Sequence, residues 1–216
     1  MQTRTELLNL LFDEWEQSIL DYKGKFVKDG IINEDRYYSA KPKILFITKE
    51  PNNPDQNEGD FRSWWMEEVK YTFAYRIAEW SYGILNGFPE YDEVWKSNRS
   101  RKALQQIAFM NIKKIGGGGS SQLSMMTEHL KMNFRFIHRQ IDIIEPDIII
   151  TGTTWGELRN QLFPQTKWIQ SGYDILVGRH KKAKVIDYYH PSSRTPPAAS
   201  YSLLQNIVLS EKFKRL

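Results

Sequence analysis

The stretch Lys43-Ile44-Leu45-Phe46-Ile47 decides the fold that this sequence predicts, because it is a short and continuous apolar run. A run of this kind, bounded by loop residues, is typical of a strand buried on both faces of a sheet. Similar apolar runs recur further along the chain, at residues 107–110, 148–150, 173–177 and 184–186. The last two predict a hairpin or two sequential strands.

Helical patterns separate these runs. Apolar residues at helical spacing predict helices at residues 5–22, 61–85, 91–106, 124–144, 155–162 and 199–214. Strands that alternate with helices of this length favour a parallel sheet covered on both faces. We therefore predict one α/β domain over residues 1–216, with three α/β/α layers and a central four-stranded parallel sheet. Residues 1–40 are expected to form a helical extension packed on it.

Composition limits the chemistry. The 216 residues include no cysteine, which excludes disulfides, iron–sulfur clusters, thiolate nucleophiles and thiolate zinc sites. Histidines and carboxylates show no compact ligand pattern, so we expect neither a metal nor an organic cofactor. The formal net charge of +4 is compatible with a polyanionic partner such as DNA.

No apolar run approaches the 18 residues of a membrane-spanning helix, and the first residues do not resemble a signal peptide. We therefore expect no membrane partner and a cytoplasmic location. We also expect a monomer.

Polar residues follow the predicted strands. The loops that leave them are residues 48–52, 111–114, 151–155 and 189–192. If the strands are parallel, these loops gather on one rim of the sheet, which is where α/β proteins of this kind bind ligands. The rim would bring together a carboxylate, an amide, hydroxyls, cations and the imidazole of His190, which Pro191 holds in an extended conformation.

The order of three motifs resembles the uracil-DNA glycosylase superfamily over roughly residues 42–214. The motifs are Glu50-Pro51 after the first strand, Asn111 after the second, and His190-Pro191-Ser192 after the last. The resemblance implies a small α/β fold that excises uracil or a related deaminated base from DNA. Thr48, Glu50 and Asn52 depart from the residues usual in that first loop, so the chain resembles a divergent, cysteine-free member.

The resemblance also implies residue roles. Neutral His190 would donate a hydrogen bond to the departing base, and ionised Glu50 would hold a water and offset charge on the sugar. Asn111 would read one edge of uracil. Base recognition is further expected from Pro51, Phe61 and Trp64, with Phe61 as the first choice for stacking. DNA contacts are expected from Lys49, Lys113, Lys114, Ser192, Ser193 and Arg194, with phosphate-binding backbone in the glycine-rich loop at residues 116–121.

Other interpretations remain open. Taken singly, Glu50 is typical of a solvated loop acid, Asn111 of a strand-end cap, and Lys113-Lys114 of an exposed surface pair. One alternative function is a nucleic-acid or nucleotide-binding module that has the fold without base excision. A second is a metal-independent hydrolase acting on a small nucleotide-like substrate.

Overall fold

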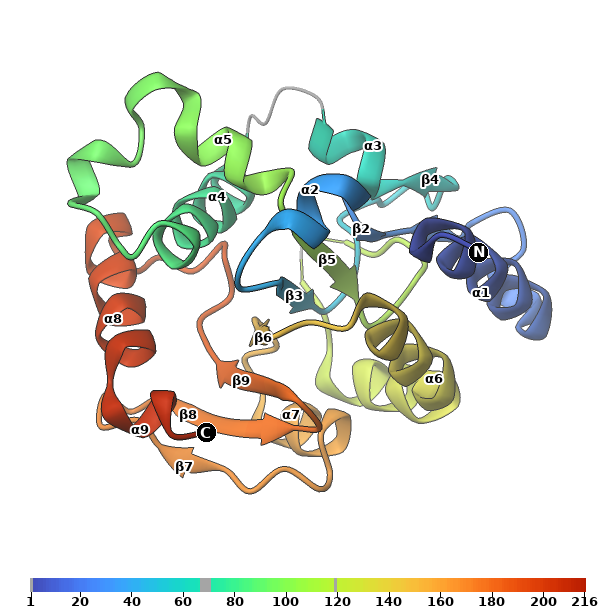
Figure 1. Cartoon of the computed structure of the whole chain (residues 1–216). Helices are drawn as coiled ribbons and strands as arrows, with labels where there is room; N and C mark the ends of the chain where they lie inside the picture. The colour runs from blue at the N-terminus through green and yellow to red at the C-terminus, as the bar shows by residue number, and fades with distance from the viewer. Residues whose placement is uncertain (1, 67–70, 119) are drawn as a thin grey trace.

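The computed structural model describes residues 2–66, 71–118 and 120–216. Within these ranges the protein is a mixed α/β structure whose main sheet has seven strands (Figure 1). Their order across the sheet is β2 (Gly30–Ile31), β5 (Ile107–Asn111), β3 (Ile44–Thr48), β6 (Ile148–Thr151), β9 (Ala183–Asp187), β8 (Leu176–His180) and β7 (Ile169–Gln170).

The sheet is larger than predicted and mixed in direction. β5, β3, β6 and β9 pair in parallel, whereas β2, β8 and β7 pair antiparallel at the two sides. The expectation of a central four-stranded parallel sheet is therefore met only in part, because four strands pair in parallel but the sheet has seven strands and is mixed. β2 and β7 have two residues each, which is too short to leave a periodic hydrophobic signal. A separate parallel pair joins β1 (Val27–Lys28) to β4 (Gly59–Asp60).

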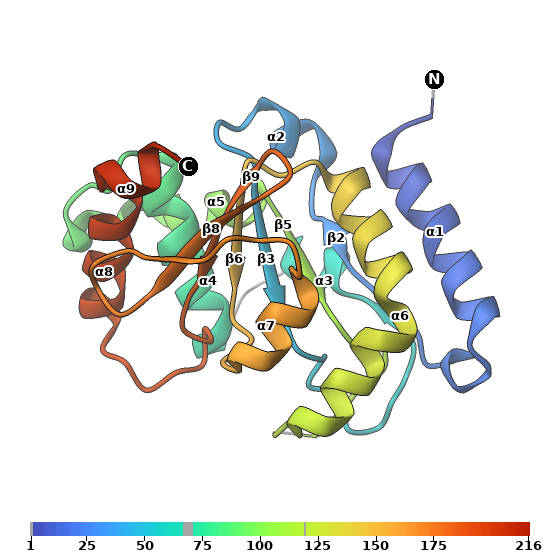
Figure 2. The ribbon, with the colours of Figure 1, turned by 90° about the horizontal axis from the view of Figure 1, so that it is seen from below.

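Helices cover both faces of the sheet (Figure 2). One face carries α3 (Phe61–Met66), α4 (Thr72–Leu85), α5 (Arg99–Leu104), α8 (Pro197–Leu209) and α9 (Glu211–Lys214). The other carries α1 (Arg4–Ser18), α6 (Leu123–Ile144) and α7 (Gly156–Leu162). The remaining short helices are η1 (Leu20–Tyr22), α2 (Glu34–Ser39), η2 (Tyr91–Glu93) and η3 (Lys96–Asn98).

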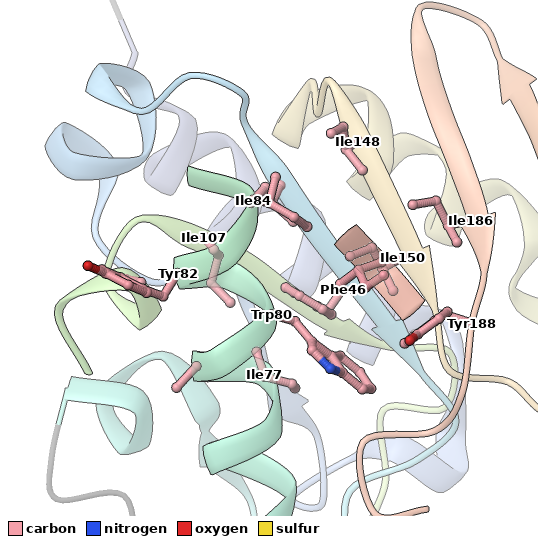
Figure 3. Packing of buried hydrophobic residues seen from close by; sticks show 14 of the residues in the cluster. Phe46, Ile77, Trp80, Tyr82, Ile84, Ile107, Ile148, Ile150, Ile186 and Tyr188 are labelled. Atoms are coloured by element: carbon pink, nitrogen blue, oxygen red, sulfur yellow. The ribbon is translucent and has the colours of Figure 1, made fainter. Parts of the chain in front are cut away.

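Alternation along β3 explains why the sheet has two cores. Side chains of successive strand residues point to opposite faces, so Ile44 and Phe46 join the core under α4 and α8, whereas Leu45 and Ile47 join the core under α1 and α6. Figure 3 shows the first core, where the indole of Trp80 stacks on Phe46 with ring centroids 6.5 Å apart. Burial on both faces is the reason that β3 reads as a continuous apolar run.

The predicted helices agree with the helices of the structure to different degrees. The helix predicted at residues 124–144 is confirmed as α6. The helix predicted at residues 61–85 is described as α3 and α4, and its part at residues 67–70 lies outside the described residues. Residues 91–106 form η2, η3 and α5 instead of one helix.

Residues 1–40 are more than a helical extension, because this segment also supplies β1 and the edge strand β2. α1 lies beside α6, and Trp15 joins the two helices. Its indole stacks on Phe136 at 5.2 Å and donates a hydrogen bond of 2.6 Å to Asn133 Oδ1. The segment is therefore an integral part of the core. Over the described ranges, no helix has both the length and the apolar character that crossing a bilayer requires.

Candidate functional site

The four parallel strands end at the same rim of the sheet. Thr48 at the end of β3 pairs with Asn111 at the end of β5, and Thr151 of β6 pairs with Asp187 of β9. The backbone continues this alignment beyond the strands, because Lys113 N–H donates to the Lys49 carbonyl at 2.9 Å. The loops that follow these strands therefore leave the sheet together, as the sequence predicted.

Glu50 does not lie free on this rim. Its Oε2 is 2.8 Å from the Lys113 ammonium, and the two side chains are only 6% and 7% exposed. The interpretation of Lys113 as an exposed cation available to DNA phosphates is therefore wrong for this conformation. Lys113 instead holds the Glu50 carboxylate in one position.

The glycine-rich loop packs against the loop that carries Glu50. Gly117 N–H donates to the Pro51 carbonyl at 3.0 Å, and the Gly117 carbonyl accepts from Asn53 N–H at 3.2 Å. A Cβ added at Gly117 would lie 2.2 Å from Glu50 Oε2, and one at Gly116 would lie 2.0 Å from the Asn53 carbonyl oxygen. These glycines are therefore required for close approach, and Gly116 is buried instead of facing a phosphate.

Asn111 is 1% exposed and lies below the rim. Its Oδ1 accepts a hydrogen bond of 2.7 Å from the Thr48 hydroxyl, and its backbone N–H donates to Asp29 Oδ2 at 2.8 Å. The Asn111 Nδ2 is buried without an acceptor. Thr48, one of the departures from the resembled first loop, thus orients this amide and leaves its NH2 group without an acceptor.

Lys114 is wholly buried, so the prediction that it contacts DNA is wrong. Its ammonium lies 2.6 Å from Asp29 Oδ1, which also accepts from Gln140 Nε2 at 2.7 Å. Burial lowers the pKa of Lys114, while Asp29 opposes that shift. This ion pair fixes the segment of residues 27–31 against β5 and α6.

His190 is held as a neutral hydrogen-bond donor. Its Nδ1 accepts from the Ser192 backbone N–H at 3.1 Å, so the neutral ring carries its proton on Nε2. Burial lowers the pKa of His190 to about 4, and the positive charge of Lys49 adds to this shift. At neutral pH the ring is therefore uncharged, with Nε2–H available.

Lys49 and Gly152 link the third loop to its neighbours. The Lys49 ammonium lies 4.5 Å from the ring centroid of Trp155, and burial lowers the pKa of Lys49 while Glu50 opposes the shift. A Cβ added at Gly152 would lie 3.1 Å from Pro191 Cδ and 3.3 Å from His190 Cα. Glycine at this position lets the His190 loop approach the end of β6.

The aromatic ring in contact with His190 is Phe73, which the sequence reasoning missed. Its centroid is 6.0 Å from the imidazole and 5.6 Å from Phe109 of β5. Phe61 packs on Phe109 at 5.9 Å and on Trp64 at 5.5 Å, and both rings are partly buried. Phe73 follows the start of α4 by one residue, a helix boundary that the pattern of residues 61–85 does not mark.

The remaining predicted contacts differ in exposure. Ser192 and Arg194 are exposed, Ser193 is partly exposed, and Pro51, next to Glu50, is buried. Their roles toward DNA or a base stay predictions. Among the residues that the structure describes, no group of three or more His, Asp or Glu side chains is arranged to hold a metal ion.

Comparison with known proteins adds no assignment. No family model matches the chain, and no curated protein matches it either.

Proposed function

We propose that the rim binds a nucleotide of DNA and hydrolyses the N-glycosidic bond of uracil or a related deaminated base. The observation that carries the proposal is neutral His190, whose Nε2–H is free to donate, on the same rim as the Glu50 carboxylate. The proposal takes the inner strands β5, β3, β6 and β9 as the glycosylase-like parallel sheet that the motifs predict.

In this proposal His190 stabilises the leaving base. The base departs as an anion, and a fixed N–H donor stabilises negative charge that develops in the transition state. A neutral imidazole keeps this role over a wide pH range, because its pKa of about 4 prevents protonation near neutrality. Phe73 lies beside the ring, with the two centroids 6.0 Å apart.

Glu50 acts on the sugar side of the bond. β3 and β9 are separated by β6, so their ends are about 10 Å apart at the usual strand spacing, a separation comparable to the length of a nucleoside. An ionised carboxylate there offsets the positive charge of an oxocarbenium-like sugar and holds the attacking water. The Lys113 ammonium, 2.8 Å from Glu50 Oε2, holds this carboxylate in position.

Asn111 contributes base recognition through its unused Nδ2 donor. The O4 carbonyl of uracil would satisfy this donor, whereas the 4-amino group that cytosine carries at the same position would not. Since the amide is 1% exposed, the flipped base reaches it only when the loops above it separate.

The test is excision from an oligonucleotide with one uracil, scored as alkali-labile abasic sites. We expect Glu50→Gln and His190→Gln to lose excision while remaining folded by circular dichroism. Glu58→Gln is the matched control, because Glu58 is an exposed acid near the end of the same loop. Full activity in either site variant would contradict the assigned roles.

A binding module without excision is the second candidate. The burial of Asn111 and the ion pair that engages Glu50 favour it, because both restrict access to the groups that chemistry needs. Intact uracil, hypoxanthine and xanthine substrates, together with DNA binding that weakens steeply with salt, would establish this candidate and exclude excision.

A further inference from the structure

A second site lies between α4, α8 and the segment that contains η2 and η3. It is a pocket of about 380 Å³, within the range of roughly 300–1,000 Å³ typical of small-molecule sites. Its lining residues are Thr72, Tyr75, Arg76, Glu79, Trp95 and Pro197. None of them belongs to the rim assigned above, so the pocket is a separate feature.

The pocket contains a buried carboxylate with an unused oxygen. Glu79 is 4% exposed, and its Oε1 accepts a hydrogen bond of 2.7 Å from the Tyr91 hydroxyl. Its Oε2 accepts no hydrogen bond and forms an ion pair with Arg76, whose Nη1 is 3.5 Å away. Burial raises the pKa of Glu79, while Tyr91, Arg76 and Trp95 oppose the shift. The ion pair offsets part of the cost of burying this oxygen, and a donor supplied by a ligand would complete its hydrogen bonding.

Arg76 supplies the complementary charge. It is 4% exposed, and its Nη1 donates to the Ser200 hydroxyl at 3.0 Å, which fixes the guanidinium beside Glu79. The pair is neutral overall and places a donor next to an acceptor. Such a surface favours an uncharged ligand edge that carries an N–H beside a carbonyl, and it disfavours a simple cation or anion.

Two aromatic rings form the wall of the pocket. Tyr75 and Trp95 are each 42% exposed, and their centroids lie 5.4 Å apart at an interplanar angle of 76°. Partly exposed aromatic rings beside a buried polar pair are suited to stack on a flat ring. The wall and the polar pair together select a planar heterocycle with a lactam edge.

We propose that this pocket binds a guanine base. Guanine N1–H and its 2-amino group are donors for the Glu79 carboxylate, and guanine O6 is an acceptor for the Arg76 guanidinium. Adenine carries an acceptor at N1, which would face the carboxylate. Uracil has a lactam edge but lacks the second ring for stacking and the additional amino donor.

The guanine can come from a free nucleotide or from a DNA strand. The chemistry is the same in both cases, and neither case depends on base excision at the rim. Binding of GMP is compared with binding of IMP, AMP and UMP by calorimetry. A second series uses single-stranded oligonucleotides that contain one guanine, or one hypoxanthine at the same position.

We expect GMP or the guanine oligonucleotide to bind at least about tenfold more tightly than AMP or an adenine oligonucleotide, with hypoxanthine between them. A preference in the GMP series alone identifies a free nucleotide, and one in the oligonucleotide series alone identifies DNA. Absence of a guanine preference in both series would overturn the proposal.

Substitutions in the pocket test whether guanine binds there. Tyr75→Ala should weaken guanine binding by roughly tenfold, and Tyr173→Ala is the matched control because Tyr173 is 43% exposed in the β7–β8 connection. Glu79→Gln should remove the preference for guanine over adenine. Should Glu79→Gln fail to fold, Trp95→Leu at an exposed position replaces it. Unchanged guanine binding in both Tyr75→Ala and Trp95→Leu would exclude the pocket.

Discussion

The Glu50 carboxylate and the Lys113 ammonium lie 2.8 Å apart, and more than nine-tenths of each side chain is buried. The pair joins the loop after β3 to the loop after β5, next to the point where Thr48 pairs with Asn111. It therefore fixes the position of the acid on which the proposed chemistry depends.

Removing one partner of this pair should destabilise the protein. Lys113→Met leaves the Glu50 carboxylate buried without its cation, and we expect the free energy of unfolding to fall by about 3 kcal/mol. The double variant Glu50→Gln with Lys113→Met should recover much of that loss. Urea unfolding of the wild type, Glu50→Gln, Lys113→Met and the double variant measures the coupling energy between the two side chains. Additive losses of unfolding free energy in the double variant would show that the two groups do not interact.

Gly117→Ala should displace the carboxylate with little change in the overall fold. The new Cβ would lie 2.2 Å from Glu50 Oε2, so the side chain must move and excision should fall by at least about tenfold. Gly118→Ala is the matched control, because a Cβ there meets nothing within 4 Å. Equal excision rates for the two variants would mean that the position of Glu50 is not important.

Lys114 and Arg194 should behave in opposite ways. Lys114→Met leaves Asp29 buried without its cation, so we expect a loss of about 3–5 kcal/mol in unfolding free energy. Arg194→Ala, at an exposed position, should leave the free energy of unfolding unchanged. It should reduce the slope of the logarithm of the DNA-binding constant against the logarithm of salt concentration by about one, as expected for the loss of one phosphate contact. A stable Lys114→Met protein with a reduced salt dependence would restore Lys114 as a DNA contact.

The neutral state of His190 makes stability depend on pH. Its pKa is about 4 in the folded protein and 6.5 when unperturbed, so only the unfolded chain takes up this proton between those values. Stability is therefore full above pH 6.5 and falls as the pH drops toward 4, by up to about 1.4 kcal/mol per pH unit for one such group.

The check is the slope of unfolding free energy against pH. His180, whose burial also lowers its pKa to about 4, contributes to the same window. His190→Gln should therefore reduce the slope without abolishing it. Excision by the wild type should show no loss near pH 6.5, and a loss there would mean that His190 titrates normally.

The alternation of buried runs and helices was enough to predict an α/β fold and, for parallel strands, that the loops after β3, β5, β6 and β9 lie on one rim. That part follows from local hydrophobic pattern and from the direction of parallel strands. The edge strands β2 and β7 were missed, since two-residue strands form only through pairing with a neighbour. The start of α4 at Thr72 was missed as well, because aromatic residues lie on both sides of it and favour one continuous helix.

The sequence by itself determined which chemical groups follow the strands, namely Glu50, Asn111 and His190. Only the tertiary structure decided which of them are accessible. Lys113 and Lys114 are adjacent in sequence and look alike, yet one pairs with Glu50 and the other with Asp29 from a segment far away in the chain. Burial and charge pairing depend on what the fold brings alongside, and no local pattern encodes those partners.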